Sequence, residues 1–288
     1  MRSGLKKRPD FDTVSPFVMK KETPLFEEIL EAAQEAAFAG GTIINRFFRD
    51  QADIGIRRKE QNDFVTRVDN EVEAAISRIL HRHFPGHQIL AEEGGFRHPQ
   101  SPFLWVIDPL DGTTNYIQGI PQFAVSLGLM EKEKPLFGLI YNPILGEQFH
   151  AFRGKGSFRN NEPIRVSQTD RLDLAFGATG FPFKQHGMLP GYLSAFEEIM
   201  RKTIDMRRCG SAALDLAYTA CGRYDFFWEA FLQPWDFAAG AVLIMEAGGM
   251  ITNFSGQPLK IHSDSVIAAN RRIYEEIKGI VQRIFVPR

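Results

Sequence analysis

Two stretches near the start of the chain have the spacing of amphipathic helices. Apolar residues recur every three or four positions over 24–48, and Thr23 followed by Pro24 is a typical helix start. A second helical pattern follows Thr66, where Asp69 has the spacing of a capping box, and a Pro-Gly pair at 85–86 ends it. We therefore predict two helices, separated by a polar segment over 49–62.

The middle of the chain has the patterns of β-strands. Over 123–130, large apolar residues alternate with small ones, which is the period of a half-buried strand. A Gly-rich, hairpin-like stretch then ends near residue 165. The strands are predicted at 87–91, 104–107, 123–130, 136–141 and 148–152.

The second half alternates strands with helices. Strands are predicted near 174–179, 225–228 and 266–269, and helices over 192–202, 211–221, 235–247 and at the C-terminal end. This alternation is typical of a layered α/β architecture. We expect one domain over 24–288 with lobes 24–165 and 166–288. Residues 1–23, with a charge excess and two prolines, are expected to be a disordered extension.

The composition narrows the class of protein. With 44% hydrophobic and 24% charged residues, the chain is globular rather than fibrous or disulfide-rich. Its 34 basic and 35 acidic residues give no net attraction to nucleic acid or to an anionic membrane. No apolar run reaches the roughly 18 residues of a membrane span, and the first 23 residues lack the apolar region of a secretory signal. Two cysteines favour a reducing compartment, so a cytoplasmic protein is expected.

The string WVIDPLDGTTNY, residues 105–116, carries the strongest chemical signal. Asp108 ends an apolar strand that Pro109 is expected to break, and Asp111 follows three residues later. Two carboxylates at opposite ends of a tight turn can bind hard cations through oxygen. The following Gly112 and Thr113 offer backbone N–H groups at a helix start, where phosphate is stabilised. A loop with an Asx-turn and a helix cap is the purely structural alternative.

Further acidic residues lie at corresponding positions of other predicted elements. Glu92 and Glu93 follow the strand at 87–91, and Asp236 stands where a helix begins. Each has an ordinary explanation, since paired glutamates are usually solvated and aspartate often caps a helix. Acidic groups gathered at strand ends and helix starts nevertheless predict an oxygen-rich Mg²⁺ site. The sequence leaves open whether they meet in space.

Five blocks of the sequence resemble the inositol monophosphatase family of Mg²⁺-dependent, lithium-sensitive phosphatases, most closely its bacterial branch. The resemblance covers about residues 24–285 in order and spacing. It implies an αβαβα sandwich of the type shared with fructose-1,6-bisphosphatase, and a homodimer. The blocks are NDFVTRVD (62–69), AEEGG (91–95), WVIDPLDGTTNY (105–116), RRCGSAALDLAY (207–218) and PWDFAAG with EAGG (234–240 and 246–249).

The resemblance implies a role for each matching acidic residue. Glu92, Asp108 and the Leu110 carbonyl are expected to bind a first Mg²⁺. Asp108, Asp111 and Asp236 are expected to bind a second, and Glu92 a weaker third with the help of water. Lithium is expected to inhibit.

The same resemblance assigns the remaining residues of the site. Thr113 paired with Asp69 is expected to orient the attacking water, with Glu92 as a further catalytic residue. Arg207 is placed near the dimer interface, although Arg207 and Arg208 could also be phosphate ligands. The expected substrate-binding residues are Gly112, Thr113, Gly210, Ser211, Ala212, Glu229 and Asp236.

The expected function is hydrolysis of a small phosphate monoester by metal-activated water, and the expected substrate is inositol 1-phosphate. Glu229 lies in the apolar run YDFFWEAF, so its carboxylate faces either a polar pocket or the exposed end of a strand. Alternative substrates are fructose 1,6-bisphosphate, 3′-phosphoadenosine 5′-phosphate and histidinol phosphate. A protein of another class, acting mainly as a partner of protein or RNA machinery, is the second alternative. Contact with nucleic acid or transcription machinery has no support in the composition.

Overall fold

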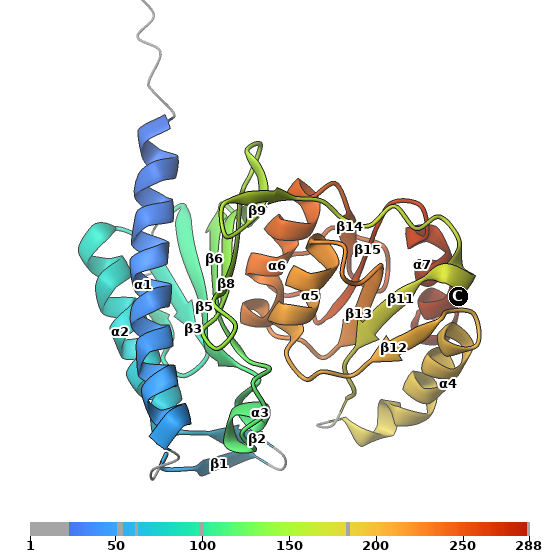
Figure 1. Ribbon diagram of the computed structural model, residues 1–288, viewed down its shortest axis with the longest axis horizontal. Helices are drawn as coiled ribbons and strands as arrows, with labels where there is room; N and C mark the ends of the chain where they lie inside the picture. The colour runs from blue at the N-terminus through green and yellow to red at the C-terminus, as the bar shows by residue number, and fades with distance from the viewer. Residues whose placement is uncertain (1–22, 51–53, 61–62, 98–100, 183–184, 287–288) are drawn as a thin grey trace, which may run out of the picture.

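Five layers, in the order helix, sheet, helix, sheet, helix, stack across the computed structural model (Figure 1). The structure describes residues 23–50, 54–60, 63–97, 101–182 and 185–286. The expected αβαβα sandwich is therefore confirmed. The predicted disordered extension lies, apart from Thr23, outside the described residues. Among the helices of the described ranges, none combines the length and the apolar character that crossing a bilayer requires.

The first layer consists of α1 (Thr23–Asp50) and α2 (Arg67–His83), which pack on one face of the larger sheet. The small side chains of Ala33, Ala36 and Ala37 on the buried face of α1 allow this close approach. Thr66 caps α2, and the reciprocal bonds of the predicted capping box with Asp69 are both present.

The larger sheet has eight strands, in the order β10-β9-β8-β7-β6-β5-β3-β4. Neighbours are antiparallel except β3 and β5, which are parallel. The strands are β3 (Gln88–Ala91), β4 (Gly95–Arg97), β5 (Phe103–Asp111), β6 (Ala124–Glu131), β7 (Lys134–Asn142), β8 (Glu147–Phe152), β9 (Gly156–Arg159) and β10 (Glu162–Ile164).

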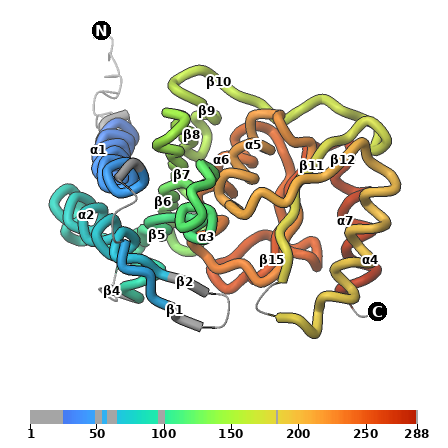
Figure 2. Tube along the Cα trace, turned by 60° about the horizontal axis from the view of Figure 1, so that its bottom comes forward, coloured from blue at the N-terminus to red at the C-terminus, as the bar shows by residue number. Residues whose placement is uncertain are grey.

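The central layer consists of α5 (Ala212–Ala220) and α6 (Pro234–Glu246), and Figure 2 shows it between the two sheets from a second direction. Every residue of α5 is buried, which explains why this helix is apolar apart from Asp215 and Thr219. The contact between α6 and the larger sheet requires glycine, because a Cβ atom on Gly138 would overlap the backbone of Ala239. This close packing fixes the first turns of α6 against β7 of the larger sheet.

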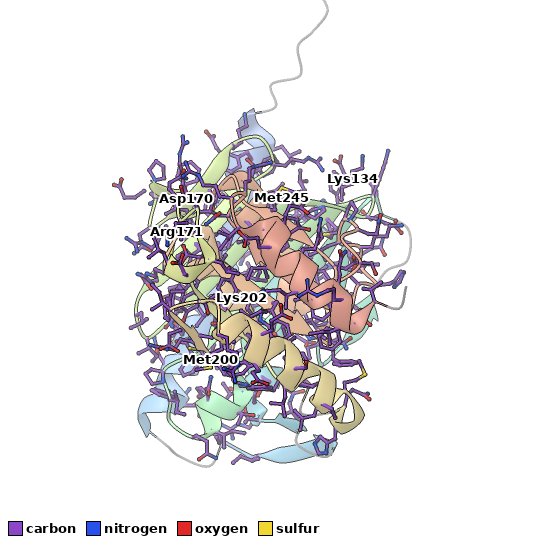
Figure 3. All side chains as sticks on the ribbon, turned by 90° about the vertical axis from the view of Figure 1, so that its right-hand side faces the viewer. Lys134, Asp170, Arg171, Met200, Lys202 and Met245 are labelled. Atoms are coloured by element: carbon purple, nitrogen blue, oxygen red, sulfur yellow. The ribbon has the colours of Figure 1, made fainter. Side chains whose placement is uncertain are left out.

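The smaller sheet has five strands, in the order β12-β11-β13-β15-β14. Its outer face is covered by α4 (Leu189–Met200) and α7 (Tyr274–Phe285), which lie in front in Figure 3. Tyr192 of α4 stacks on Trp228 of the sheet with ring centroids 4.5 Å apart. The strands are β11 (Phe176–Thr179), β12 (Asp205–Arg207), β13 (Phe226–Ala230), β14 (Met250–Thr252) and β15 (Ser265–Ala269).

Short elements account for most departures from the predicted secondary structure. The polar segment over 49–62 contains β1 (Arg57–Glu60), which pairs with β2 (Asp63–Val65). The strand predicted from 174 begins at Phe176, because η1 (Leu172–Leu174) forms a single helical turn before it. The other short elements are α3 (Thr113–Ile117) and η2 (His186–Met188).

Candidate active site

A β-bulge in β5 places Asp108 and Asp111 on the same face of the sheet. Asp108 lies opposite Ser126 and Asp111 opposite Ala124, so three steps along β5 match two steps along β6. In a regular strand, residues three apart point to opposite faces, and one extra residue corrects this. The prediction that Pro109 ends the strand is therefore wrong. β5 continues to Asp111, and the proline occupies the bulge, a position within a sheet that tolerates it.

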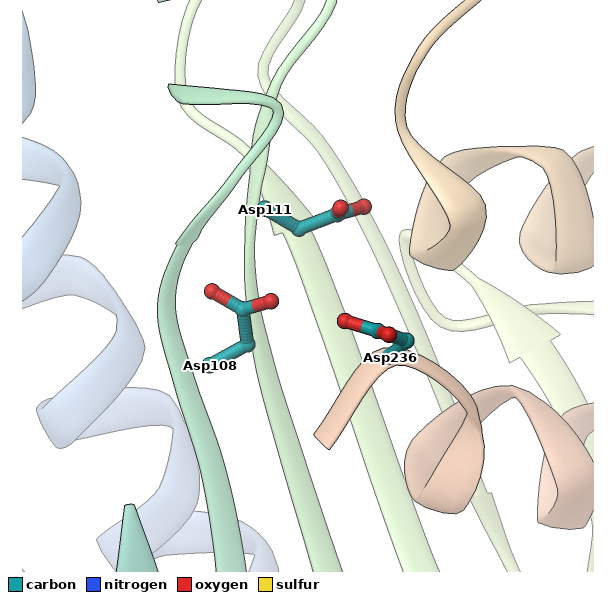
Figure 4. Close-up of side chains that lie close together, drawn as sticks. All are labelled: Asp108, Asp111 and Asp236. Carbon is teal, nitrogen blue, oxygen red and sulfur yellow. The ribbon is translucent and has the colours of Figure 1, made fainter. Parts of the chain in front are cut away.

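Asp236 reaches the same place from the first turn of α6. Its Oδ2 atom accepts a hydrogen bond from the backbone N–H of Gln233 at 2.6 Å, so it also caps the helix. One carboxylate oxygen each from Asp108, Asp111 and Asp236 lie within 4.8 Å of one another (Figure 4). The three predicted metal ligands thus form one cluster between β5 and α6.

The cluster is electrostatically unfavourable when no cation is present. Burial raises the pKa of Asp108 and of Asp236 well above the usual range, and the neighbouring carboxylates raise both further. Burial also raises the pKa of Asp111 to about 6. Carboxylate oxygens brought this close fit a hard divalent cation such as Mg²⁺, which would relieve their repulsion.

Glu92 lies at the edge of this cluster, in the turn after β3. Its backbone N–H donates to the carbonyl of Ile107 at 3.3 Å, which extends the pairing of β3 with β5. Its charge contributes to the raised pKa of Asp108 and of Asp236, so its carboxylate is near both. Glu92 is nevertheless not one of the three side chains that meet within 4.8 Å.

Leu110, which precedes Asp111 on β5, is bonded to Asp108 and lies close to Thr113. Its N–H donates to Asp108 Oδ1 at 2.9 Å, and its carbonyl lies 3.0 Å from the hydroxyl oxygen of Thr113. The side chain is fully buried. Its carbonyl is thus at the site, and its role as a Mg²⁺ ligand stays a prediction.

Thr113 and Asp69 form a direct pair. The Thr113 hydroxyl donates to Asp69 Oδ1 at 3.1 Å, while Oδ2 of the same carboxylate accepts from the backbone N–H of Thr66 at 2.8 Å. Asp69 therefore caps α2 and holds Thr113 at once. A Thr113 hydroxyl that gives its proton to Asp69 keeps oxygen lone pairs that can accept a hydrogen bond from water.

Gly112 supplies the conformation that turns β5 into α3. Its φ of +94° lies in the left-handed region, and an added Cβ would lie 2.8 Å from the carbonyl oxygen of Gln122. The backbone of Gly112 and Thr113 then opens a helix of only five residues. The predicted contact of this backbone with phosphate stays a prediction.

The predicted substrate pocket is joined to the cluster through the start of α5. Ser211 caps α5, and its hydroxyl donates to Asp111 Oδ2 at 2.5 Å. The N–H of Ala213 donates to the same oxygen at 2.8 Å. Gly210, Ser211 and Ala212 thus lie directly beside Asp111. The structure therefore places these predicted pocket residues beside the cluster of three aspartates.

Asn115 was missed in the sequence, although it lies within the 105–116 string. Its side-chain amide donates to the carbonyls of Gln122 and Cys209, both at 2.8 Å. These bonds attach the loop before Gly210 to the larger sheet. Only the presence of a polar residue after two threonines could have drawn attention to it.

Glu229 lies on β13, half-buried, with its carboxylate against Gly180, where a Cβ atom would collide with it. Burial raises its pKa to about 8, the charge of Asp111 adds to this rise, and Arg208 opposes it. A second carboxyl, Asp215 on α5, is fully buried, and its Oδ1 atom has no hydrogen-bond partner in the described ranges. Sequence reasoning did not single out Asp215.

The two adjacent arginines differ in their surroundings. Arg207 pairs with Asp205 at 2.5 Å and lies over the ring of Phe176 at 4.8 Å. Arg208 instead lowers the pKa of Asp111 and of Glu229, so its charge acts on the site. Whether either arginine binds phosphate stays a prediction.

Comparison with known proteins agrees with this arrangement. The model of the inositol monophosphatase family matches residues 25–284. The chain is 39% identical over 261 residues to "Nus factor SuhB" of Pseudomonas aeruginosa, covering 89% of this chain and 96% of that protein.

Two solved structures have the same fold. The extragenic suppressor protein suhB of Bartonella henselae superposes with a TM-score of 0.85 at 36% identity, covering 88% of this chain and 98% of that one. The inositol monophosphatase of Anabaena superposes with a TM-score of 0.82 at 38% identity, covering 90% and 97%. The sequence match over nearly the whole chain and the shared fold together show that this protein belongs to the inositol monophosphatase family.

Proposed function

We propose that the protein is a Mg²⁺-dependent phosphatase that hydrolyses a small phosphate monoester. The observation that supports this most is the cluster of Asp108, Asp111 and Asp236 within 4.8 Å, beside the Thr113–Asp69 pair. A cation site with an adjacent hydrogen-bond acceptor for water is what hydrolysis by water requires. No covalent nucleophile is needed, and Cys209, whose pKa is raised by burial, is a poor one.

Each residue of the site would have a defined role in cation binding, water orientation or phosphate binding. Asp108, Asp111 and Asp236 would hold Mg²⁺, with Glu92 and the Leu110 carbonyl as further ligands and a total of two or three ions. Bound Mg²⁺ supplies neutralisation of the phosphate oxygens and acidifies water. Thr113, oriented by Asp69, would accept a hydrogen bond from the attacking water. The N–H groups of Gly112 and Thr113 would bind the phosphate.

The substrate we propose is inositol 1-phosphate, a phosphorylated polyol. The pocket beside Asp111 offers the backbone of Gly210 and Ala212, the hydroxyl of Ser211 and the carboxyl of Glu229. Among the described residues, none forms a hydrogen bond or an ion pair with the Glu229 carboxyl, so its oxygens are available to ring hydroxyls. Hydroxyl recognition by such groups separates polyol phosphates from simpler esters.

A phosphate-release assay tests this proposal. Purified protein with Mg²⁺ would be given inositol 1-phosphate, glycerol 2-phosphate, fructose 1,6-bisphosphate, 3′-phosphoadenosine 5′-phosphate and histidinol phosphate at equal concentrations. We expect turnover to depend on Mg²⁺ and kcat/KM to be highest for inositol 1-phosphate. Equal, slow turnover on every ester would remove the substrate assignment, and no turnover on any would remove the phosphatase assignment.

A second candidate function is that of a partner in transcription machinery. It is favoured by the name "Nus factor" of the Pseudomonas aeruginosa relative rather than by any surface of this chain. The intact cluster of carboxylates argues against a purely non-catalytic role. Co-purification of the tagged parent and of an Asp236→Asn variant would separate the two functions, since a partner role should survive loss of the carboxylate.

We further propose that the protein is a cytoplasmic homodimer. Apolar side chains gather where α4 ends: Leu174, Met200 and Ile204 are 53%, 48% and 63% exposed. Ile204 is tied to this corner by its N–H, which donates to the Ala175 carbonyl at 2.9 Å, and Met200 is labelled on the same face in Figure 3. Arg207 lies nearby on β12. Ile204→Glu should shift the protein to monomers in analytical ultracentrifugation.

A further inference from the structure

A row of polar residues occupies the buried face of α2. Asp69, Glu73 and Ser77 are spaced four residues apart and are 1%, 4% and 6% exposed. Residues at this spacing lie one above another on a helix. A carboxylate as deeply buried as that of Glu73 is costly unless it accepts hydrogen bonds. The buried Glu73 carboxylate therefore requires a hydrogen-bond donor.

That partner is the turn that carries Glu92. The Oε2 atom of Glu73 accepts a hydrogen bond from the backbone N–H of Glu93 at 2.8 Å. On the other side, the N–H of Glu92 is bonded to Ile107 of β5 at 3.3 Å. The backbone is thus fixed on both sides of the Glu92 side chain. The N–H of Glu92 is bonded to β5, and the N–H of Glu93 is bonded to α2. Residues 92–94 form a turn between β3 and β4, where strand pairing does not hold Glu93.

Asp69, one turn earlier on the same helix, holds Thr113 at 3.1 Å. We propose that α2 is a rigid spacer for the site and that Glu73 is a positioning residue, which acts through the Glu93 backbone to place the carboxylate of Glu92 against Asp108 and Asp236. This inference rests on the proposed function only in assuming that the cluster binds a divalent cation. Charge-assisted bonds to backbone N–H groups are well suited to fixing such a turn.

The alternative is that Glu73 only stabilises the fold. Glu73→Ala, which removes the acceptor, and Glu73→Gln, which keeps an acceptor oxygen, distinguish the two. Glu71→Ala is the matched control, because Glu71 lies on the same helix but forms an exposed ion pair with Arg67. The readouts are amide hydrogen exchange, resolved for 92–95, 67–83 and 112–117, and calorimetric titration with Mg²⁺ and Mn²⁺.

We expect Glu73→Ala to speed exchange at Glu93 about 10-fold and to weaken cation binding about 10-fold, as removal of a residue that orients a metal ligand does. Exchange over 112–117 should stay at the parent level, Glu73→Gln should recover most of the protection, and Glu71→Ala should match the parent. If Glu73→Ala leaves Glu93 protected, or loosens 67–83 as much as 92–95, the positioning role is overturned. Absence of phosphatase activity in the parent would instead overturn the proposed function, since exchange and titration need no turnover.

Discussion

The N–H of Ala213, at the start of α5, donates a hydrogen bond of 2.8 Å to the carboxylate of Asp111, at the end of β5. This bond joins residues that lie 102 positions apart in the chain. It connects the larger sheet to the helix that begins the predicted substrate pocket. The carboxylate cluster and the predicted substrate pocket are therefore directly connected, and a substitution at Asp111 should affect both.

Asp111→Asn should stabilise the metal-free protein at neutral pH. The folded protein holds the Asp111 proton with a pKa of about 6, against 3.8 ordinarily, so the unfolded chain releases it first as the pH rises. Stability therefore falls between about pH 4 and pH 6, by up to about 3 kcal/mol, and then stays level. Asparagine does not ionise and should escape this loss.

Thermal melts in the presence of a chelator check this. The Asp111→Asn variant should melt at a higher temperature than the parent at pH 8, with the difference vanishing near pH 4. With Mg²⁺ the order should reverse, because a ligand bound only by the folded parent stabilises it. Equal melting temperatures at pH 8 without metal would show that burial does not disfavour the ionised form of Asp111 in the folded protein.

Asp236→Asn should abolish most phosphate release while α6 stays folded. Asparagine can still accept the hydrogen bond from the Gln233 N–H, so the helix cap survives. It replaces an anionic oxygen by a neutral one in the cluster, and we expect kcat/KM to fall about 100-fold or more. Asp173→Asn is the control, because Asp173 is exposed and paired with Arg171, and its kcat/KM should equal that of the parent. Near-normal turnover of Asp236→Asn at ordinary Mg²⁺ concentrations would exclude Asp236 as a ligand.

Much of this arrangement could be predicted from the sequence because it depends on local rules. Long helices with caps were predicted to within a few residues, as α2 shows after Thr66. The three-residue strands β4, β12 and β14 were missed, since only a neighbouring strand makes them strands. Pro109 was misinterpreted for the same reason: the rule that proline ends a strand is local, and its place in a bulge depends on β6.

The same distinction between local rules and packing applies to the residues of the site. Asp108, Asp111 and Asp236 were predicted to stand at element ends, and the structure brings them together although Asp108 lies within β5. Glu73 and Asp215 stand inside helices, where a charged residue is normally taken to face solvent. Their burial follows from packing between layers, which no local pattern reveals.

Thr113→Val should separate catalysis from binding. Valine has nearly the shape of threonine but cannot accept a hydrogen bond from water, so kcat should fall about 100-fold while KM changes little. Thr113→Ser keeps the hydroxyl beside Asp69 and should recover most of the activity. Steady-state kinetics with inositol 1-phosphate measures both constants. A rise in KM with unchanged kcat would place Thr113 in substrate binding alone.

Lithium should inhibit phosphate release uncompetitively with respect to substrate, as the family resemblance implies. The reason we propose is that Li⁺ takes a cation position after hydrolysis and delays the departure of phosphate. Altered carboxylates should then weaken the inhibition, and Asp236→Asn with its residual activity provides the comparison. Competitive inhibition by Li⁺ would contradict this order of events.

Glu229→Gln should weaken selection for inositol 1-phosphate over glycerol 2-phosphate. The Glu229 carboxyl has a pKa raised to about 8 by burial, so its ionised form, the stronger acceptor for ring hydroxyls, grows as the pH rises from 7 to 9. Hydrogen bonds to a charged group contribute about 1.5–3 kcal/mol, which corresponds to a preference of about 10- to 150-fold. In the parent the ratio of kcat/KM for the two substrates should therefore increase over this pH range, whereas in Glu229→Gln it should stay low and flat. Glu197→Gln, at an exposed ion pair on α4, should keep the pH dependence of the parent. If Glu229→Gln lowers turnover of both substrates equally, Glu229 supports the cluster or the fold, and the preference for inositol loses its basis in this pocket.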